Sequence, residues 1–211
     1  MQLPFSRDAF FEVFAAYNDS WWPVALVLWT ATLIAFVIRL RGRNASEWTF
    51  GLLAIQWGWS AVAYHASLFS RINPAALLFA ALFLIQAGLL IWYGVAQQRL
   101  PFSDERPSAY LVGSALVVYG LLYPLIVLVG DHSYPRVPTF GVPCPTTIVT
   151  VGFLLLVRGR VPPLVSVVPV MWAAIGGSGA FLFGVRADLA LPIAGLALAL
   201  RTWSTRPAAI A

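Results

Sequence analysis

The chain has 211 residues, of which 60% are hydrophobic and only 10% are charged, and its mean hydropathy is +0.82. A soluble domain carries about 25% charged residues, and a soluble protein this apolar would expose large patches and aggregate, so the composition excludes an ordinary soluble domain and predicts one membrane domain. The 13 basic residues are all arginines, lie singly along the chain and leave a net charge of +5. This dispersion does not predict nucleic-acid binding.

The first predicted element, within residues 1–19, is a short amphipathic helix. Phe10, Phe11 and Phe14 recur at helical spacing, and Ser6 stands where a helix cap is expected. A helix with one apolar face suits the membrane interface, so we expect it to lie in the interfacial plane. The same face would suit a lid on the end of a helical bundle, which is the alternative interpretation.

Seven apolar segments follow, and each is a predicted membrane span, since a span needs roughly 17–25 apolar residues. They are residues 20–40, 48–70, 74–96, 108–130, 145–158, 163–185 and 188–203. The fifth is short and the last two are barely separated, so six spans with one re-entrant segment is the alternative. The predicted fold is an all-α polytopic transmembrane bundle in one domain, residues 20–203, followed by a cytoplasmic tail at residues 204–211.

The arginines predict the orientation of these spans, because positively charged residues concentrate in cytoplasmic loops. Nine lie at or after the ends of the first, third, fifth and seventh segments: Arg39, Arg41, Arg43, Arg99, Arg106, Arg158, Arg160, Arg201 and Arg206. Four lie on the opposite side: Arg7, Arg71, Arg136 and Arg186. The bias predicts an external N-terminus and a cytoplasmic C-terminus.

Most of the chemically reactive side chains fall on the predicted outer side. Ionisable groups inside a membrane are costly and usually functional. His65 lies near the outer end of the second span, beside a stripe of Gln56, Ser60 and Tyr64, which share one face at a spacing of four residues. The rest of this outer group is Asn18, Asp19, Asn73, Tyr123, Asp131, His132, Tyr134, Cys144 and Asp188.

The stretch from Asp131 to Thr147, "DHSYPRVPTFGVPCPTT", holds the only cysteine of the chain between two prolines. Pro145 suits the first turn of a helix, so Cys144 is predicted at a helix N-terminus. The helix dipole there favours a thiolate and would lower the pKa of the thiol. The prolines would stiffen the loop and hold a polar site at a defined depth.

Several motifs occur in a fixed order along the chain. They are Tyr17–Asn18 with Trp22–Pro23, then Tyr64–His65 and "INPAA", then "YPRVPTFGVPCPTTI". In this order the chain resembles an uncharacterised bacterial multi-pass membrane family, the domain-of-unknown-function family 6064. The resemblance covers most of the chain up to about Gly152 and implies a helical protein of the bacterial inner membrane, but no activity. The chain departs from the family pattern at Gly130–Asp131–His132, where the motif has Gly-His before Tyr-Pro.

The favoured function is an outward-facing site for a transition metal, a haem or a small molecule. His65, His132 and Cys144 would be the metal ligands, because imidazole and thiolate bind zinc, copper and iron, and two histidines would suit a haem. Asp131 would be a fourth ligand or support a histidine. The residues expected to contact a bound cofactor or small molecule are Tyr64, Asn73, Tyr134 and Gln56.

Two other functions compete with this one. In a membrane-embedded enzyme, Cys144 would be the nucleophile, His132 or His65 the general base, and Asp131 would orient the imidazole. In a transporter or channel, the path would follow Gln56, Ser60, Tyr64, Asn73 and Gln86, although few ionisable groups lie deep enough for a carboxylate proton relay. The expected partners are membrane lipids and the bound metal or small molecule; a homo-oligomer stays open and nucleic acid is not expected.

Overall fold

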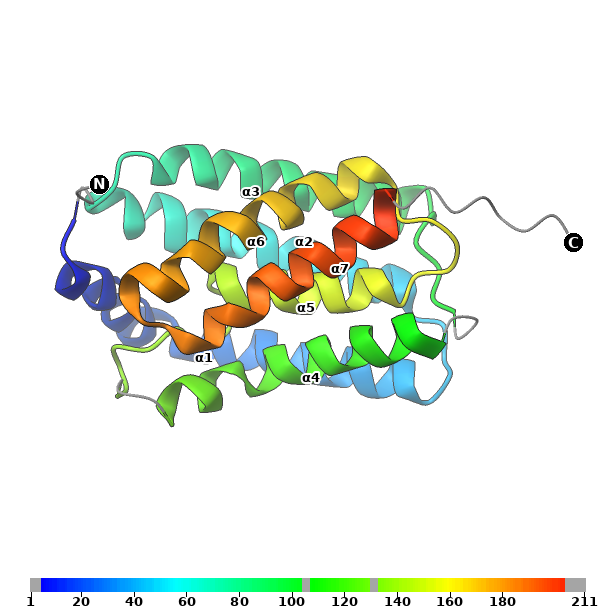
Figure 1. Cartoon of the computed structure of the whole chain (residues 1–211), viewed down its shortest axis with the longest axis horizontal. Coiled ribbons are helices and arrows are strands. Elements are labelled where there is room, and N and C mark those ends of the chain that lie inside the picture. The colour runs from blue at the N-terminus through cyan, green and yellow to red at the C-terminus, as the bar shows by residue number, and fades with distance from the viewer. Residues whose placement is uncertain (1–4, 104–106, 130–132, 204–211) are drawn as a thin grey trace, which may run out of the picture.

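The computed structural model describes residues 5–103, 107–129 and 133–203, and in them the chain forms seven α helices that run in alternating directions along one axis (Figure 1). The helices are α1 (Arg7–Leu40), α2 (Ser46–Trp59), α3 (Ala76–Leu90), α4 (Pro107–Leu128), α5 (Pro143–Leu155), α6 (Pro163–Phe183) and α7 (Ala190–Trp203). The π-helical turns η1 (Ser60–Ala66) and η3 (Ile91–Ala96) extend α2 and α3, while the 3-10 turns η2 (Phe69–Arg71) and η4 (Arg186–Leu189) lie in connections. The all-α prediction is confirmed.

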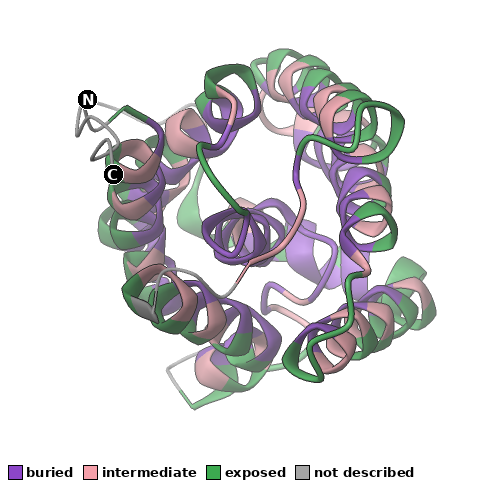
Figure 2. Ribbon diagram, turned by 90° about the vertical axis from the view of Figure 1, so that its right-hand side faces the viewer, coloured by how far each residue is buried: buried purple, intermediate pink, exposed green. Residues whose placement is uncertain are grey.

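The fifth helix, α5, occupies the centre of the bundle. Figure 2, which looks along the bundle, shows one buried helix enclosed by a ring of others, and every residue of α5 is buried except Cys144, which is partly buried. Two buried threonines satisfy their own hydroxyl groups, because Thr147 donates to the Pro143 carbonyl and Thr150 to the Thr146 carbonyl. These local hydrogen bonds let polar side chains enter the core without unpaired donors.

Glycines allow α4 to pack directly on α5. A Cβ atom at Gly113 would lie 2.7 Å from the Gly152 carbonyl oxygen, and one at Gly152 would lie 2.7 Å from a methyl group of Val117. Only glycine fits at these two positions, so the two backbones approach more closely than larger residues would permit. Close approach through small residues is typical of apolar helices that pack without water between them.

In the described part of the chain, four helical segments are long and apolar enough to cross a membrane: α1, residues 76–96 (α3 with η3), residues 108–128 of α4, and α6. The central α5 is apolar but has only 13 residues, and α7 has 14. Large apolar side chains remain exposed around the ring, among them Leu111, Phe181 and Ile193. Water would not tolerate so much exposed apolar surface on a monomer, whereas lipid would.

The amphipathic helix predicted at residues 1–19 is the beginning of a longer helix. Ser6 caps α1 by accepting a hydrogen bond from the Ala9 N–H at 3.1 Å, and the helix then runs unbroken for 34 residues. The predicted boundary at residue 19 therefore has no counterpart in the backbone. The predicted tail at residues 204–211 lies outside the described residues.

The aromatic face of this first part of α1 packs on protein. Phe10 stacks on Phe183 of α6 with ring centroids 4.2 Å apart, and Phe14 stacks on Tyr64 of η1 at 5.6 Å. Phe11 is also buried. These contacts place the start of α1 over the end of the bundle, which is the arrangement that the lid interpretation predicts.

Candidate functional site

A cavity of about 210 Å³ lies at the end of the bundle where α1 begins, on the left in Figure 1. The starts of α1, α3 and α5, the end of α6 and the turns η1, η2 and η4 all contribute to its lining. Eight of the 18 lining residues are aromatic: Phe5, Phe10, Phe14, Tyr64, Phe69, Phe79, Trp172 and Phe183. We call this space the aromatic cavity.

The rings of the aromatic cavity hold one another in place. Phe79 meets Trp172 edge to face with centroids 5.4 Å apart, and Tyr64 stacks on Phe69 at 5.7 Å. Such offset and edge-to-face pairs are the favoured geometries of aromatic side chains. The wall is therefore built from side chains whose positions are fixed by contacts with each other, as expected of a preformed ligand pocket.

The Cys144 thiol and the neighbouring Asp188 carboxyl interrupt this apolar lining, to which Asn73 and Ser178 add two further polar side chains. Asp188 lies on η4 and is 5% exposed, and its carboxyl group accepts a 2.5 Å hydrogen bond from the Tyr123 hydroxyl of α4. One turn earlier on α4, Tyr119 donates to the Ala187 carbonyl at 2.9 Å. The two tyrosines thus fix η4 on α4 and hold the carboxyl group at the cavity.

Burial changes the acidity of both groups in the same direction. It raises the pKa of the Asp188 carboxyl from 3.8 to about 7, although hydrogen bonds from Tyr123 and Cys144 oppose the rise. Burial, and then the neighbouring Asp188 carboxyl, raise the pKa of the Cys144 thiol well above its usual range. The expectation that the start of α5 would lower the pKa of this thiol is therefore wrong, because burial outweighs the helix dipole.

His65 lies behind the wall of the aromatic cavity. It is fully buried on η1 and does not line the cavity, and its ring meets Phe83 at 4.7 Å and Trp172 at 5.1 Å. Neither ring nitrogen has a hydrogen-bond partner in the described part of the chain. Trp172 lines the cavity and also touches the histidine, so it links His65 to the site without exposing it.

The proline-rich loop that precedes α5 is anchored to α1 by Asn18. The side-chain amide of Asn18 donates to the carbonyl oxygens of Pro135 at 2.6 Å and Val137 at 2.8 Å, and its oxygen accepts from the Thr139 hydroxyl at 2.5 Å. Asn18 is fully buried and every polar atom of its side chain is paired. The amide therefore satisfies backbone groups that the irregular loop leaves without partners.

Tyr17 holds the next part of the same loop. Its hydroxyl donates to the Phe140 carbonyl at 3.1 Å and accepts from the Trp59 indole at 2.8 Å. Gly141 follows in the left-handed region with φ of 84°, and a Cβ atom there would lie 2.6 Å from the Tyr17 hydroxyl. This turn leads the chain into α5 and so determines where Cys144 meets the cavity.

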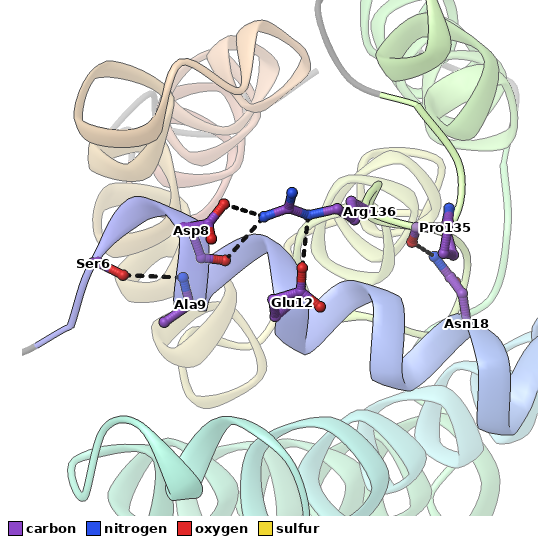
Figure 3. Close-up of polar contacts among 7 residues, drawn as sticks. All are labelled: Ser6, Asp8, Ala9, Glu12, Asn18, Pro135 and Arg136. Atoms are coloured by element: carbon purple, nitrogen blue, oxygen red, sulfur yellow. Dashed lines mark hydrogen bonds and ion pairs between the residues drawn. The ribbon is translucent and has the colours of Figure 1, made fainter.

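Figure 3 shows that charged side chains join this loop to the first turns of α1. Arg136 forms ion pairs with Asp8 and with Glu12, the latter at 3.1 Å. All three side chains are well exposed, so these pairs contribute much less than the buried hydrogen bonds of Asn18. We call the contacts of Tyr17 and Asn18 with the loop, together with the ion pairs of Arg136 with Asp8 and Glu12, the loop anchor.

The other predicted site residues are dispersed. Asn73 lines the aromatic cavity, as do Tyr64 and Cys144, whereas Gln56 is buried within α2 and donates to a threonine hydroxyl of α1 at 2.6 Å. Tyr134 is 54% exposed and does not line the cavity. Asp131 and His132 lie outside the described residues.

The described residues do not support the predicted metal or haem site. They contain no group of three or more histidine, cysteine, aspartate or glutamate side chains placed to hold a metal ion, and His65 is surrounded by aromatic rings rather than by further ligands. A haem is a drug-sized group, and pockets for such ligands measure about 300–1,000 Å³. The aromatic cavity, at about 210 Å³, is smaller than that range.

Sequence reasoning did not assign Asp188, Trp172 or Tyr123 to the site. Asp188 and Tyr123 both fall on the predicted outer side, and this shared position was the signal available in the sequence. They are separated by 65 residues, so their hydrogen bond follows only from the packing of the helices. Trp172 lies within a predicted span, where an indole is an ordinary packing residue. Trp172 belongs to the wall because its face of α6 turns toward the cavity, and the sequence alone does not specify which face does so.

Comparison with known proteins places the whole described bundle in one family. A family model described as "Family of unknown function (DUF6064)" matches residues 7–211. No curated protein and no solved structure matches the chain. The match extends beyond Gly152, where the motif resemblance ends, and so includes Trp172 and Asp188.

Proposed function

The chain belongs to the DUF6064 family, a membership that carries no activity with it, and we propose that it is a multi-pass membrane protein that binds a small, largely apolar molecule in the aromatic cavity. The observation that carries this proposal is the combination of a preformed aromatic wall with a carboxyl and a thiol group at one place. Ligand pockets typically combine apolar walls with a few polar groups that fix orientation. The π-helical turn η1, which supplies Tyr64, is of a rare type found often at functional sites.

The volume of the cavity limits the size of the ligand. An engineered apolar cavity of about 150 Å³ binds benzene. In proportion, about 210 Å³ accommodates a ligand of roughly eight non-hydrogen atoms. A small aromatic or branched aliphatic molecule with one polar group fits this limit, and the polar group would meet Asp188 or Cys144.

The proposed location is the bacterial inner membrane, with seven crossings, the cavity on the outer side and the C-terminus in the cytoplasm. Seven of the described arginines lie at the end of the bundle opposite to the cavity, and arginine favours the cytoplasmic side. They are Arg39, Arg41, Arg43, Arg99, Arg158, Arg160 and Arg201. In this proposal, α2 with η1 (residues 46–66) and the shorter α5 and α7 bring the four long spans to seven. The central α5 is enclosed by other helices.

Single cysteines would test this orientation. In a Cys144→Ala background, Ser133→Cys and Asn44→Cys place thiols at exposed positions in connections at opposite ends of the bundle. A maleimide that cannot cross membranes should label Ser133→Cys in cells whose outer membrane is permeable, and should label Asn44→Cys only after the inner membrane is opened. The reverse pattern would refute the orientation, and labelling of both in intact inner membranes would refute the membrane insertion.

Cys144 offers a direct test of ligand binding, because it is the only cysteine and lines the cavity. Benzyl alcohol has the predicted size and polarity. We expect it to slow the reaction of Cys144 with methyl methanethiosulfonate in the purified protein, to an extent that saturates with concentration and is followed by intact mass. Ser178→Trp, which changes a lining residue of α6, should remove this protection, whereas Ala174→Trp, on an exposed part of α6 outside the lining, should keep it.

Two outcomes would overturn the proposed binding. Protection that rises without saturation would indicate a solvent effect of the alcohol on the detergent. Protection of equal size in Ser178→Trp and Ala174→Trp would show that the alcohol acts elsewhere than in the aromatic cavity.

A further inference from the structure

The polar chemistry of the aromatic cavity identifies a class of ligand, an inference that rests on the binding function proposed above. The lining residues include one carboxyl group, Asp188, and no arginine or histidine. Among the described residues no basic side chain forms an ion pair with Asp188. A buried carboxylate is costly unless a cation or several hydrogen-bond donors compensate it. Here the donors to Asp188 are the Tyr123 hydroxyl and the Cys144 thiol, and both are uncharged.

The walls around this carboxyl group are aromatic rings of the kind that attract cations. Four separate elements contribute rings to the lining: Phe79 from α3, Trp172 from α6, Phe69 from η2, and Phe10 and Phe14 from α1. An organic cation within about 6 Å of such ring faces is stabilised by their quadrupoles, and cages of this type bind quaternary ammonium groups. The effect is largest where water is excluded.

We propose that the aromatic cavity binds a small organic ammonium ion, with Asp188 as its counter-ion and the aromatic rings as its cage. The ligand would have about eight non-hydrogen atoms, the limit set by the volume of about 210 Å³. A fully methylated ammonium group satisfies this limit and has no N–H that needs a hydrogen-bond acceptor, which suits a wall that offers mostly carbon. A metal cation does not fit, because the lining offers too few oxygen, nitrogen or sulfur ligands.

The nearest described cations do not occupy this place. Arg7 lies over the ring of Phe11 at 5.7 Å and close to Gly184, and it does not line the cavity. Arg186, on the same turn as Asp188, is exposed. The carboxyl group therefore faces the cavity without a positive side chain beside it.

Choline and its neutral analogue 3,3-dimethylbutan-1-ol, in which carbon replaces the charged nitrogen, provide the test. Both have the same shape, so only charge distinguishes them. We expect choline chloride to protect Cys144 from methyl methanethiosulfonate at concentrations about tenfold lower than the neutral alcohol, with sodium chloride as the control for ionic strength.

Asp188→Asn is the variant that isolates the counter-ion, since it keeps the size of the side chain and its hydrogen-bonding capacity. It should lose about tenfold in choline affinity and keep the affinity for the neutral alcohol. Asp19→Asn changes the net charge equally at an exposed position of α1 and should bind choline as the unaltered chain does.

The pH profile gives a readout that a purely structural role of Asp188 would not produce. Choline binding should strengthen as the pH rises through about 7, because the carboxyl group ionises in that range, and the profile should be flat in Asp188→Asn. The titratable groups that face Asp188 are Tyr119 and Tyr123 of α4, Tyr64 of η1 and Cys144 of α5. Phenols and thiols ordinarily titrate above pH 8. At each pH, protection by choline is calculated relative to the rate at which Cys144 reacts with methyl methanethiosulfonate without ligand.

The outcomes separate this inference from the function on which it rests. Equal protection by choline and the neutral alcohol would refute the ammonium ligand and leave the cavity as a site for neutral molecules. Choline protection that survives in Asp188→Asn would refute the role of the carboxyl group. Failure of choline, the neutral alcohol and benzyl alcohol together would refute both proposals.

Discussion

The loop anchor and the aromatic cavity lie at the same end of the bundle, and they treat their polar groups in opposite ways. In the loop anchor, the Asn18 amide is buried and each of its polar atoms has a partner at 2.5–2.8 Å. In the aromatic cavity, a buried carboxyl group has only uncharged donors, the Tyr123 phenol and the Cys144 thiol. The first arrangement stabilises the fold, whereas ionisation of the second costs free energy, which a retained proton avoids and a bound cation would offset.

This contrast changes how the motif-rich segment is interpreted. The sequence concentrates its unusual residues between Asp131 and Thr147, and that concentration suggests a catalytic or metal-binding loop. The structure assigns most of the described part of this segment to packing on Tyr17 and Asn18, and only its last residues reach the cavity. A distinctive motif can therefore mark the support of a site rather than the site.

The largest expected effect comes from removing the loop anchor. Asn18→Leu preserves the volume of the side chain but leaves two carbonyl groups and one hydroxyl group without their partner. At about 1–3 kcal/mol for each stranded buried group, we expect the free energy of unfolding to fall by about 5 kcal/mol. Denaturant unfolding in detergent micelles measures this change.

The neighbouring residue supplies the control for the loop anchor. Asp19→Leu makes a comparable substitution at an exposed position one residue further along α1, and its effect should be within about 0.5 kcal/mol of zero. If both variants lose similar stability, then the hydrogen bonds of Asn18 are not what holds the loop, and the contrast with the cavity fails.

Periodicity and composition were sufficient to predict much of the fold. Runs of apolar residues gave the all-α class, and each predicted span overlaps a helix, because the length of an apolar run follows directly from the chain. The continuity of α1 was missed, since polar Asn18 and Asp19 look like a boundary in the sequence. Asn18 faces the loop instead of interrupting the helix, and that orientation depends on the tertiary partners at Pro135 and Val137.

The candidate site was less accessible to sequence reasoning. Tyr64, Asn73 and Cys144 line one cavity, as their predicted position on one side of the membrane suggested. His65 was expected beside Cys144, yet an α-helical neighbour of Tyr64 points about 100° away from it, and here it turns into the aromatic core. The importance of Asp188 came from burial, which a single sequence does not specify for a residue in a short connection.

Replacing the carboxyl group of the aromatic cavity should change the free energy of unfolding less than Asn18→Leu does, and should raise it rather than lower it. Because burial raises the pKa of Asp188 from 3.8 to about 7, the folded chain keeps a proton that the unfolded chain releases between about pH 4 and pH 7. The free energy of unfolding should therefore fall as the pH rises through this interval, by on the order of 3–4 kcal/mol in all. Asp188→Asn should remove this loss and be more stable than the unaltered chain at pH 8, whereas Asp19→Asn should follow the unaltered chain.

Bound choline provides a second test of the contrast between the aromatic cavity and the loop anchor, because a cation in the cavity favours the ionised carboxyl group. Unfolding curves recorded with saturating choline should show a smaller loss of stability between about pH 4 and pH 7, since ligand binding to the folded chain increases as Asp188 ionises. Asn18→Leu should lower the whole profile without changing its slope, because the amide does not titrate. A pH slope that is equally steep in Asp188→Asn would assign the titration to another group and remove the energetic contrast between the cavity and the loop anchor.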